Sequence, residues 1–588
     1  DHRDLHSFPT RRSSDLAGVH YVAMHVAKQL ASANAPVDIA LVSGAAISHD
    51  LGKYGCKPEE AARTPYLHYY YTDQCMRSFG MPVIAHIAAN HSTWDLELEN
   101  LSLESLILIY ADFRVKSSRN PQGEEITYFY TLKDAFQVIL DKLDNVDDAK
   151  RERYIKVYSK LKDFEEYMES LGVNTELDSE KLERPQKKDP ALLNPDEVID
   201  TLKNLAIEHN INLMSKFNNE TSFGNLVEAA RSEKQWKNIR AYISIFKEYS
   251  TYMTQKQKQM VLHFLYELLM HREGDIRRQA AYVMGELIAG YDEEYRKELP
   301  AGALIRSDEM TGLDLWDIYL KEIIFPDYKI TDQHRRWIGY ALRSIFKSIL
   351  GQCKNGEIKK YIETLLKYYD DPEINDASAF VLLDSMLFIP FEICSPENKL
   401  KALEFAAGVS ARKVTEIKIS ALRCAKYAIE SDNSPALVRF AERIIRNSRG
   451  MNGISAVYLK YKILEAAGDQ TLESDKCSSM LYSKENGISD IFLENLKTDT
   501  PWVIKAVNIE LLLDRLEQGM EEELLHITTH LSNLLKVSER VTVRHSAGKA
   551  LLSVIQRLPL DQRNEVVIEL TRGLEIGEYQ FSKYIPEY

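Results

Sequence analysis

The chain has few cysteines, no long apolar run and no excess of basic residues. Its six cysteines are scattered over 588 residues without a Cys-x-x-Cys pair, which argues against a zinc knuckle and favours a reducing compartment. We therefore expect a cytoplasmic protein. No stretch approaches the roughly 20 apolar residues that a membrane-spanning helix requires, so no membrane insertion is expected. The formal net charge of -14 disfavours non-specific binding to nucleic acid.

Apolar residues recur at helical spacing along most of the chain. With 45% hydrophobic and 28% charged residues, the composition is that of an ordinary folded protein. The i, i+3, i+4, i+7 spacing predicts an all-α fold. We expect a first helical domain over residues 17–172, a charged and proline-bounded linker over residues 173–195, and a second helical domain over residues 196–588.

The two ends of the chain do not follow this pattern. Residues 1–16 carry no apolar period, and the segment from Phe8 to Leu16 resembles the translation of a sequencing-adapter oligonucleotide. We therefore expect residues 1–16 to be non-native, with authentic sequence beginning near Ala17 and the native N-terminus missing. The C-terminal end is aromatic and lacks an evident polar cap, so we expect a truncation there as well.

The pair His49-Asp50 follows a helix of small apolar residues. Both side chains normally avoid burial, because an unpaired buried charge is costly. A divalent metal removes that cost, since neutral imidazole and carboxylate are both good ligands for first-row metals. The pair therefore marks a candidate metal site, provided that further ligands stand at workable positions.

Further candidate ligands stand on both sides of the pair. Upstream, Val19 to Leu30 has the apolar spacing of one helix face, and His20 falls on the flank of that face. Downstream come His68 in a tyrosine-rich segment, then His91, then Asp112 after an apolar stretch. In chain order the candidate ligands are His20, His49, Asp50, His68, His91 and Asp112.

This order of residues resembles the HD-domain metal-dependent phosphohydrolases, in which an all-α bundle gathers such residues around one or two metals. The resemblance covers about Ala17 to Arg119. It is closest to the group that splits diadenosine tetraphosphate symmetrically, because both share His-Asp-x-x-Lys, two middle histidines and a terminal Ala-Asp followed by Arg. His20 lies one residue out of register with the Leu30-Ala31 pair that closes the first helix of that pattern.

The resemblance implies two divalent ions, most readily Fe, Mn or Co, with Asp50 bridging them. His20, His49 and Asp112 would complete one site, and His68 and His91 the other; single-metal members of the superfamily lack the two middle histidines. Two such ions can share a hydroxide, lower its pKa towards neutrality and polarise a phosphoryl oxygen. The expected activity is hydrolysis of a nucleotide or dinucleotide polyphosphate, with Asp50 as a catalytic residue.

Four basic residues are candidates for binding the substrate. Lys53 lies one helical turn beyond the His49-Asp50 pair, so its ammonium can reach a substrate phosphate and serve catalysis; the alternative is a solvated lysine near a helix end. Arg114, Lys116 and Arg119 follow Asp112 as a cationic run. This run is either a polyphosphate clamp or a set of bases that favours a helix C-terminus.

A basic element recurs in the second half of the chain. It combines an aliphatic residue, a base and a small or polar residue, at positions 276–284, 417–425, 504–512 and 543–551. The gaps between the copies are close to three, two and one units of the roughly 40–47 residues of HEAT or armadillo repeats. We expect residues 196–588 to form a HEAT-like α-solenoid whose concave face binds a protein partner that the sequence does not name. The alternative is an irregular all-α domain.

Two functions remain open at this point. The first is a metal-dependent phosphohydrolase joined to a helical-repeat scaffold. The second is a regulatory scaffold that binds a nucleotide or metal without turnover. A complete set of six candidate ligands favours the enzyme, because unused metal ligands have no structural reason to be kept together.

Overall fold

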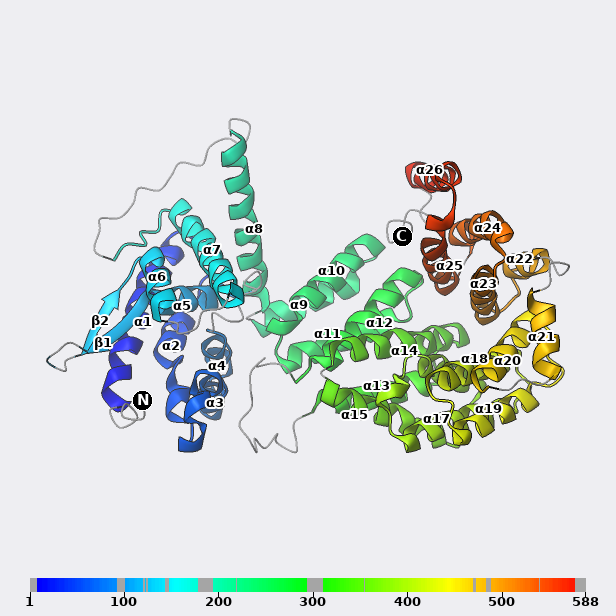
Figure 1. The fold of residues 1–588 in the computed structure, drawn as a ribbon. Coiled ribbons are helices and arrows are strands. Elements are labelled where there is room, and N and C mark those ends of the chain that lie inside the picture. Colours follow the sequence, from blue (N-terminus) through cyan, green and yellow to red (C-terminus); the bar gives the residue numbers. More distant parts are fainter. Residues whose placement is uncertain are drawn as a thin grey trace. The chain divides into compact units, whose positions relative to one another are not determined.

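The computed structural model describes residues 8–91, 101–119, 122, 125–142, 148–177, 194–217, 219–292, 310–353, 355–468, 472–482, 488–538 and 540–576. Over these residues the chain is almost entirely α-helical, with one two-stranded antiparallel hairpin (Figure 1). The predicted all-α class is confirmed. Among the described residues, none of the helices has both the length and the apolar character that crossing a bilayer demands.

The chain divides into two compact units. The first comprises residues 1–264 and 290–311, and the second residues 265–289 and 312–588. The first unit therefore extends past the segment 173–195, for which the sequence predicted a linker. Residues 178–193 of that segment lie outside the described ranges.

The first unit contains ten helices among its described residues, together with the hairpin and short 3-10 helices. Their bounds are α1 (Phe8–Ser32), α2 (Ile39–Ser48), η2 (Leu51–Tyr54), η3 (Pro58–Arg63), α3 (Thr64–Ser78), α4 (Pro82–Ala89), α5 (Leu103–Arg114), β1 (Val115–Arg119), β2 (Glu125–Phe129), α6 (Leu132–Lys142), α7 (Asp148–Ser170), α8 (Pro195–Phe217), α9 (Glu220–Ser232), α10 (Trp236–Glu248) and η7 (Ser250–Tyr252). Helix α1 begins inside the segment that was expected to be non-native. Helix α11 (Gln255–Leu268) crosses the border between the two units.

Helices α1, α2, α4 and α5 pack on one another around the core of the first unit. The predicted apolar face of α1 is confirmed, since its six members are fully buried: Val19, Val22, Ala23, Val26, Ala27 and Leu30. Helix α2 presents the small residues Ala45 and Ala46 to the same core. Helix α5 is buried along most of its length, so Asp112 is held on a central element.

The hairpin is a feature that the sequence analysis did not predict. Strands β1 and β2 pair antiparallel, with Val115 opposite Phe129 and Ser117 opposite Thr127. The segment Glu125–Phe129 is rich in β-branched and aromatic residues, which favour strands. Lys116 and Arg119 therefore lie on a strand and not at a helix C-terminus, as one of the two interpretations of the cationic run supposed.

The second unit is built from consecutive helices. Their bounds are α12 (Gly274–Ala289), α13 (Gly312–Ile324), α14 (Asp332–Gln352), α15 (Asn355–Lys367), α16 (Asp376–Met386), α17 (Pro396–Val409), α18 (Thr415–Ser431), α19 (Pro435–Asn447), α20 (Ile454–Ala466), α21 (Leu472–Tyr482), α22 (Ser489–Leu496), α23 (Trp502–Glu517), α24 (Leu524–Val537), α25 (Val541–Val554) and α26 (Leu560–Ile576). Helices α12, α14, α16, α18 and α20 pack one on the next, as do α13, α15, α17 and α19. Helices α23 and α25 extend the first of these rows, since α23 contacts α18 and α20.

The four recurring basic elements fall on α12, α18, α23 and α25, which all belong to the same row. In three of them the base donates to backbone carbonyls. Arg277 donates to the carbonyls of His271 (2.5 Å) and Arg272 (2.9 Å). Lys505 donates to the carbonyl of Lys497 (2.5 Å), and Lys418 to that of Asn447. Lys505 and Lys418 thus satisfy carbonyls at the C-terminal ends of α22 and α19, whereas Arg277 satisfies carbonyls of the loop between α11 and α12.

Helices α12 and α14 approach each other closely at Gly285. A Cβ atom there would lie 2.4 Å from the carbonyl oxygen of Ile345 and 2.6 Å from the Cβ of Ser348. We expect Gly285→Ala to lower the free energy of unfolding by about 1–3 kcal/mol, because an overpacked contact forces backbone shifts. Chemical denaturation measures the change.

The matched control is Gly408→Ala in α17, where the added methyl group meets no atom within 4 Å. That variant should be neutral or more stable, by up to about 1 kcal/mol, because alanine favours the helix. Equal effects of the two substitutions would contradict the close approach of α12 and α14.

Candidate metal centre

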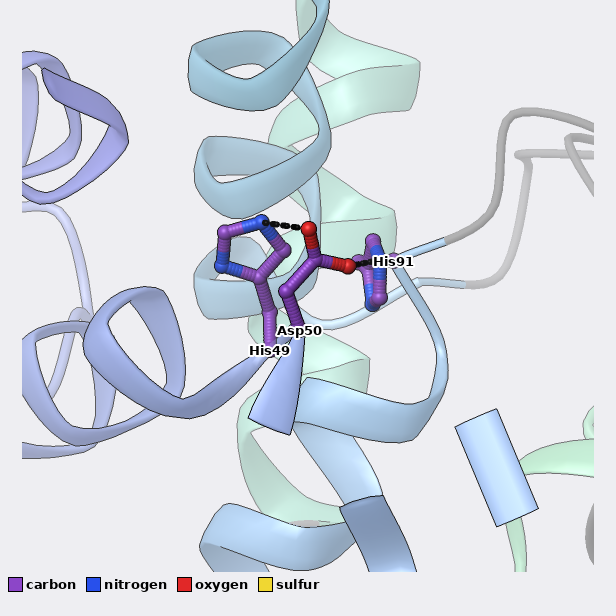
Figure 2. Close-up of side chains that lie close together, drawn as sticks. All are labelled: His49, Asp50 and His91. Atoms are coloured by element: carbon purple, nitrogen blue, oxygen red, sulfur yellow. Dashed lines mark ion pairs between the residues drawn. The ribbon is translucent and has the colours of Figure 1, made fainter. Parts of the chain in front are cut away.

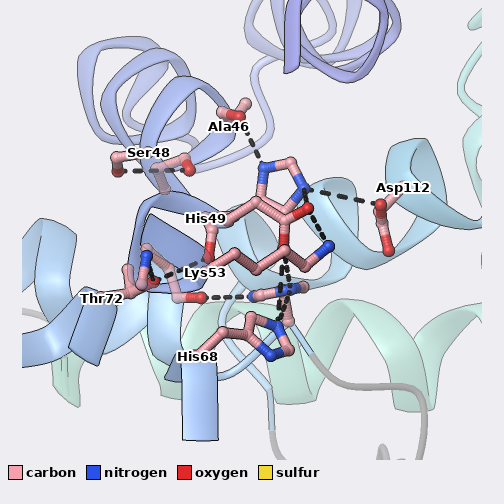
Figure 3. A network of polar contacts seen from close by, with 12 residues as sticks. Ala46, Ser48, His49, Lys53, His68, Thr72 and Asp112 are labelled. Carbon is pink, nitrogen blue, oxygen red and sulfur yellow. Dashed lines mark hydrogen bonds and ion pairs between the residues drawn. The ribbon is translucent and has the colours of Figure 1, made fainter. Parts of the chain in front are cut away.

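Helix α2 places the His49-Asp50 pair at its C-terminal end. The helix begins at Asp38, whose carboxylate accepts from the backbone N–H groups of Ala40 (2.9 Å) and Leu41 (3.1 Å). At the other end, the Nδ1 of His49 bonds to the carbonyl of Ala46 (2.8 Å). This bond fixes the imidazole so that Nε2 points away from the helix, towards Asp50 and α5 (Figure 3).

Hydrogen bonds to Thr72 and a close backbone approach at Gly52 hold this pair against α3. The hydroxyl of Thr72 donates to the carbonyl of His49 (3.0 Å) and accepts from the N–H of Gly52 (2.8 Å). A Cβ atom on Gly52 would lie 1.8 Å from the carbonyl oxygen of His68. Glycine is therefore required here, because any side chain would push α3, and His68 with it, away from Asp50.

Five of the six predicted ligands converge. Asp50 Oδ1 lies 3.5 Å from Nε2 of His68 and 3.8 Å from Nε2 of His91. Its other oxygen, Oδ2, lies 3.9 Å from Nε2 of His49, which is 3.5 Å from Oδ1 of Asp112. Figure 2 shows the Asp50 carboxylate between the rings of His49 and His91. The ligand atoms of His49, Asp50 and His91 all lie within 4.8 Å of one another, a spacing that a single ion can bridge.

The three histidines share one orientation. Each bonds through Nδ1 to a backbone carbonyl: His49 to Ala46, His68 to Thr64 (2.9 Å) and His91 to Ala88 (2.5 Å). A carbonyl only accepts, so each Nδ1 carries the hydrogen and a neutral ring keeps its lone pair on Nε2. The three lone pairs then face carboxylate oxygens, and Nε2 of His68 lies 3.4 Å from Nε2 of His91. This assembly of acceptors requires bound protons or a cation at its centre.

His20 is not part of this group, and its assignment as a ligand is not supported by the structure. Its Nε2 bonds to the hydroxyl of Ser43 (2.8 Å). Both residues lie on the facing helices α1 and α2. The one-residue offset of His20 from the family pattern is the signal in the sequence that corresponds to this difference, since one residue turns a helical side chain by about 100°.

The predicted substrate-binding residues differ in their positions and contacts. Lys53 forms an ion pair with Oδ2 of Asp50, so it lies at the centre itself. Arg114 is buried and donates to Tyr110 Oη (2.7 Å) and to the carbonyls of Thr175 (2.7 Å) and Tyr130 (2.8 Å). Its expected role in a polyphosphate clamp is not supported, because internal acceptors take up its donors.

Lys116 and Arg119 complete the cationic run. The ammonium of Lys116 donates to the backbone carbonyl of Asp112 (2.8 Å), so it lies beside the candidate centre. The side chain of Arg119 falls outside the described part of the structure, and its role as a phosphate ligand stays a prediction.

Electrostatics tie the protonation states of the site together. Burial opposes charge on His49, yet its hydrogen bond to Asp112 and the attraction of Asp50 raise its pKa. Burial lowers the pKa of His91 well below its ordinary value, and the nearby His49 lowers it further. Burial would raise the pKa of Asp50, but attraction to His49 and Lys53 lowers it. The hydrogen bond to His49 likewise holds the pKa of Asp112 far below its usual range against the effect of burial. Both carboxylates are therefore ionised at neutral pH.

The site is open on one side. The side chains of Asp112 and Lys53 are 36% and 28% exposed, whereas those of His49, His68 and His91 are 5% exposed or less. A ligand from solvent therefore reaches the site past Asp112 and Lys53, and the imidazoles of His68 and His91 form its closed end.

Two residues of the site were missed from the sequence. Thr72, the residue that clasps the His49-Asp50 turn, lies four positions after His68 on the same face of α3. Tyr69 packs in tilted contact against His68, with ring centroids 3.8 Å apart, and against His91 at 4.8 Å. The i, i+4 spacing of His68 and Thr72 was visible in the sequence, but a lone threonine carries no chemical signal of its own.

Comparison with known proteins adds no further assignment: no family model and no curated protein matches the chain.

The role of the two hydrogen bonds of the Thr72 hydroxyl can be tested directly. Thr72→Val keeps the volume but leaves the buried N–H of Gly52 and carbonyl of His49 without a partner. We expect the free energy of unfolding to fall by about 1–3 kcal/mol and the affinity for Mn²⁺ to fall with it, as measured by denaturation and calorimetry. Thr72→Ser retains the hydroxyl and should behave as wild type; weakened metal binding in both variants would argue against the hydrogen bonds as the cause.

The raised pKa of His49 predicts that metal binding releases a proton. In the metal-free protein, Nε2 of His49 holds a proton above pH 6.5, the ordinary value for histidine, whereas a metal needs the lone pair of that atom. Affinity for Mn²⁺ should therefore decrease as the pH falls through the pKa of His49, with about one proton released per occupied site at pH values below it. Calorimetry in two buffers of different ionisation enthalpy measures the release, and equal heats in both buffers would rule it out.

Proposed function

We propose that the first unit is an HD-type metal-dependent phosphohydrolase that acts on a nucleotide or dinucleotide polyphosphate. The observation that carries this proposal is the convergence of three buried imidazole Nε2 atoms and two ionised carboxylates in one site that is open on the side of Asp112. Such a group is costly to bury without a bound cation, because several of its members are acceptors that face one another.

The residues fit a pair of divalent ions. His49, Asp112 and Oδ2 of Asp50 would hold one, and His68, His91 and Oδ1 of Asp50 the other. Mixed nitrogen and oxygen donors suit Fe, Mn or Co better than Ca²⁺ or Mg²⁺, which prefer oxygen alone. The bond of each Nδ1 to a carbonyl also matches the arrangement that orients histidines at metal sites.

The chain's own groups then supply binding and orientation. When bound, the ions would lower the pKa of a water molecule and polarise a phosphoryl oxygen. Lys53, on the open side, is placed to bind a phosphate of the substrate through a charge-assisted hydrogen bond. Asp112 faces the same opening, and the buried histidines exclude water from the far side. A chain of phosphates carries a high negative charge, so it suits a site where divalent ions and the ammonium of Lys53 would lie at the open side.

The second unit supports the interpretation as a helical-repeat scaffold. Alternate helices pack in rows, and the recurring basic elements share one row. Between α13, α14, α16, α18 and α22 to α24 lies a cavity of about 1140 Å³, whose wall includes Tyr340, Phe380 and Trp502 in edge contact. We propose that this unit binds another protein, as stacked helical repeats commonly do.

Hydrolysis of a panel of nucleotides and dinucleoside polyphosphates with Mn²⁺, Fe²⁺ or Co²⁺ tests the proposed activity. We expect turnover that His91→Ala and Asp50→Asn each lower by at least about 100-fold, the scale on which loss of a key electrostatic group acts. His209→Ala, on the exposed face of α8, is the control histidine and should leave the rate unchanged. His20→Ala should reduce the rate far less than His91→Ala, because His20 contacts Ser43 and not the centre.

Two outcomes would reject parts of this proposal. Turnover that survives Asp50→Asn would remove the metal centre from the mechanism. Bound metal, measured by elemental analysis, without turnover across the panel would favour the other function considered above, a regulatory protein that binds metal or nucleotide.

A further inference from the structure

The two oxygens of the Asp50 carboxylate have different surroundings. Within the described part of the chain, Oδ1 faces the imidazole nitrogens of His68 and His91. Oδ2 faces the imidazole of His49 and also forms an ion pair with the ammonium of Lys53. Among the described residues, an ammonium group therefore lies on one side of the carboxylate and none on the other.

This ammonium lies where one of the two proposed ions would bind. The position between His49, Asp112 and Oδ2 of Asp50 brings a divalent ion next to the Lys53 ammonium, and like charges a few ångströms apart repel strongly. The position between His68, His91 and Oδ1 carries no such opponent among the described residues. The two positions must therefore differ in affinity, with the one beside Lys53 the weaker.

The ammonium of Lys53 can also lie in solvent, away from Asp50. Its side chain is 28% exposed and lies at the open side of the site, on the short 3-10 helix η2 that is anchored by Gly52. The four-carbon stem of a lysine turns readily into solvent. An anion that arrives at the opening can thus take the ammonium away from Asp50 without any movement of the backbone.

We propose that Lys53 is an internal counter-cation that couples the metal position beside His49 and Asp112 to the substrate. In the absence of an anion, its ammonium neutralises Oδ2 of Asp50 and keeps the position beside His49 and Asp112 weak. A phosphate group at the opening binds the ammonium, and the weak position then gains affinity for a divalent ion. Because linkage is reciprocal, metal at that position also strengthens binding of the anion. This inference rests on the proposed function, and it adds a specific order in which the site fills.

Titration of the metal-stripped full chain with Mn²⁺ in a calorimeter, with and without sulfate, tests the coupling. Sulfate carries the charge of a phosphate group without precipitating Mn²⁺. In the wild type we expect a strong and a weak binding step, with the weak step tightened about tenfold by sulfate, within the usual range of coupling between sites. Lys53→Met should show the tightened step without sulfate and no further response to it.

Two variants guard against indirect effects. Lys53→Arg keeps the positive charge and should retain a weak second step, whereas a purely structural disturbance would alter it as Lys53→Met does. Lys28→Met removes an exposed lysine of α1 and should match the wild type in both steps.

The outcomes separate this inference from the proposed function. A weak step that is unchanged or weaker in Lys53→Met would overturn the role of Lys53 while leaving the metal centre intact. A single bound ion in both the wild type and Lys53→Met would overturn it as well. Absence of any Mn²⁺ binding by the wild type would instead reject the metal centre and the proposed function with it.

Discussion

The negative charge of Asp50, buried among imidazoles, is the constraint on which the candidate site depends. An ionised carboxylate in a buried place needs compensating charge, and its neighbours provide it through Lys53 and the raised pKa of His49. The position of that carboxylate is set by the backbone, because Gly52 and Thr72 fix the turn after α2 directly on α3. The position of Asp50 relative to His68 therefore follows from one close contact between the turn after α2 and helix α3.

The sequence predicted most of this site from two different signals. His49 and Asp50 were selected because such residue types are rarely buried without a partner, and His68, His91 and Asp112 because their order along the chain resembles the HD-domain pattern; the structure brings these five together. Spacing along the chain could not decide the direction of a side chain on the flank of a helix. His20 was assigned to the site although its ring bonds to Ser43, and Arg114 was assigned to a polyphosphate clamp although it is buried.

The fold shows a similar division between what periodicity determines and what it leaves open. Helical spacing predicted the all-α class and the buried face of α1, since each depends on a repeated pattern of apolar residues. The hairpin of β1 and β2 depends on pairing between two short segments, which no single period in the chain reveals. The exposed stripe Val198, Leu202 and Leu205 on α8 shows the reverse case, in which a helical apolar pattern exists without burial among the described residues.

The second unit shows that a recurring sequence element need not be a functional motif. In α12, α18 and α23 the recurring base bonds to backbone carbonyls: Arg277 to those of the loop before α12, Lys418 and Lys505 to those at the ends of α19 and α22. Each of these three bases has an acceptor within the chain, so its recurrence is explained without a ligand. In the first unit the candidate ligands instead form a single cluster that is not repeated along the chain. We therefore expect a chemical function at that cluster, and a structural role for the bases that recur in the second unit.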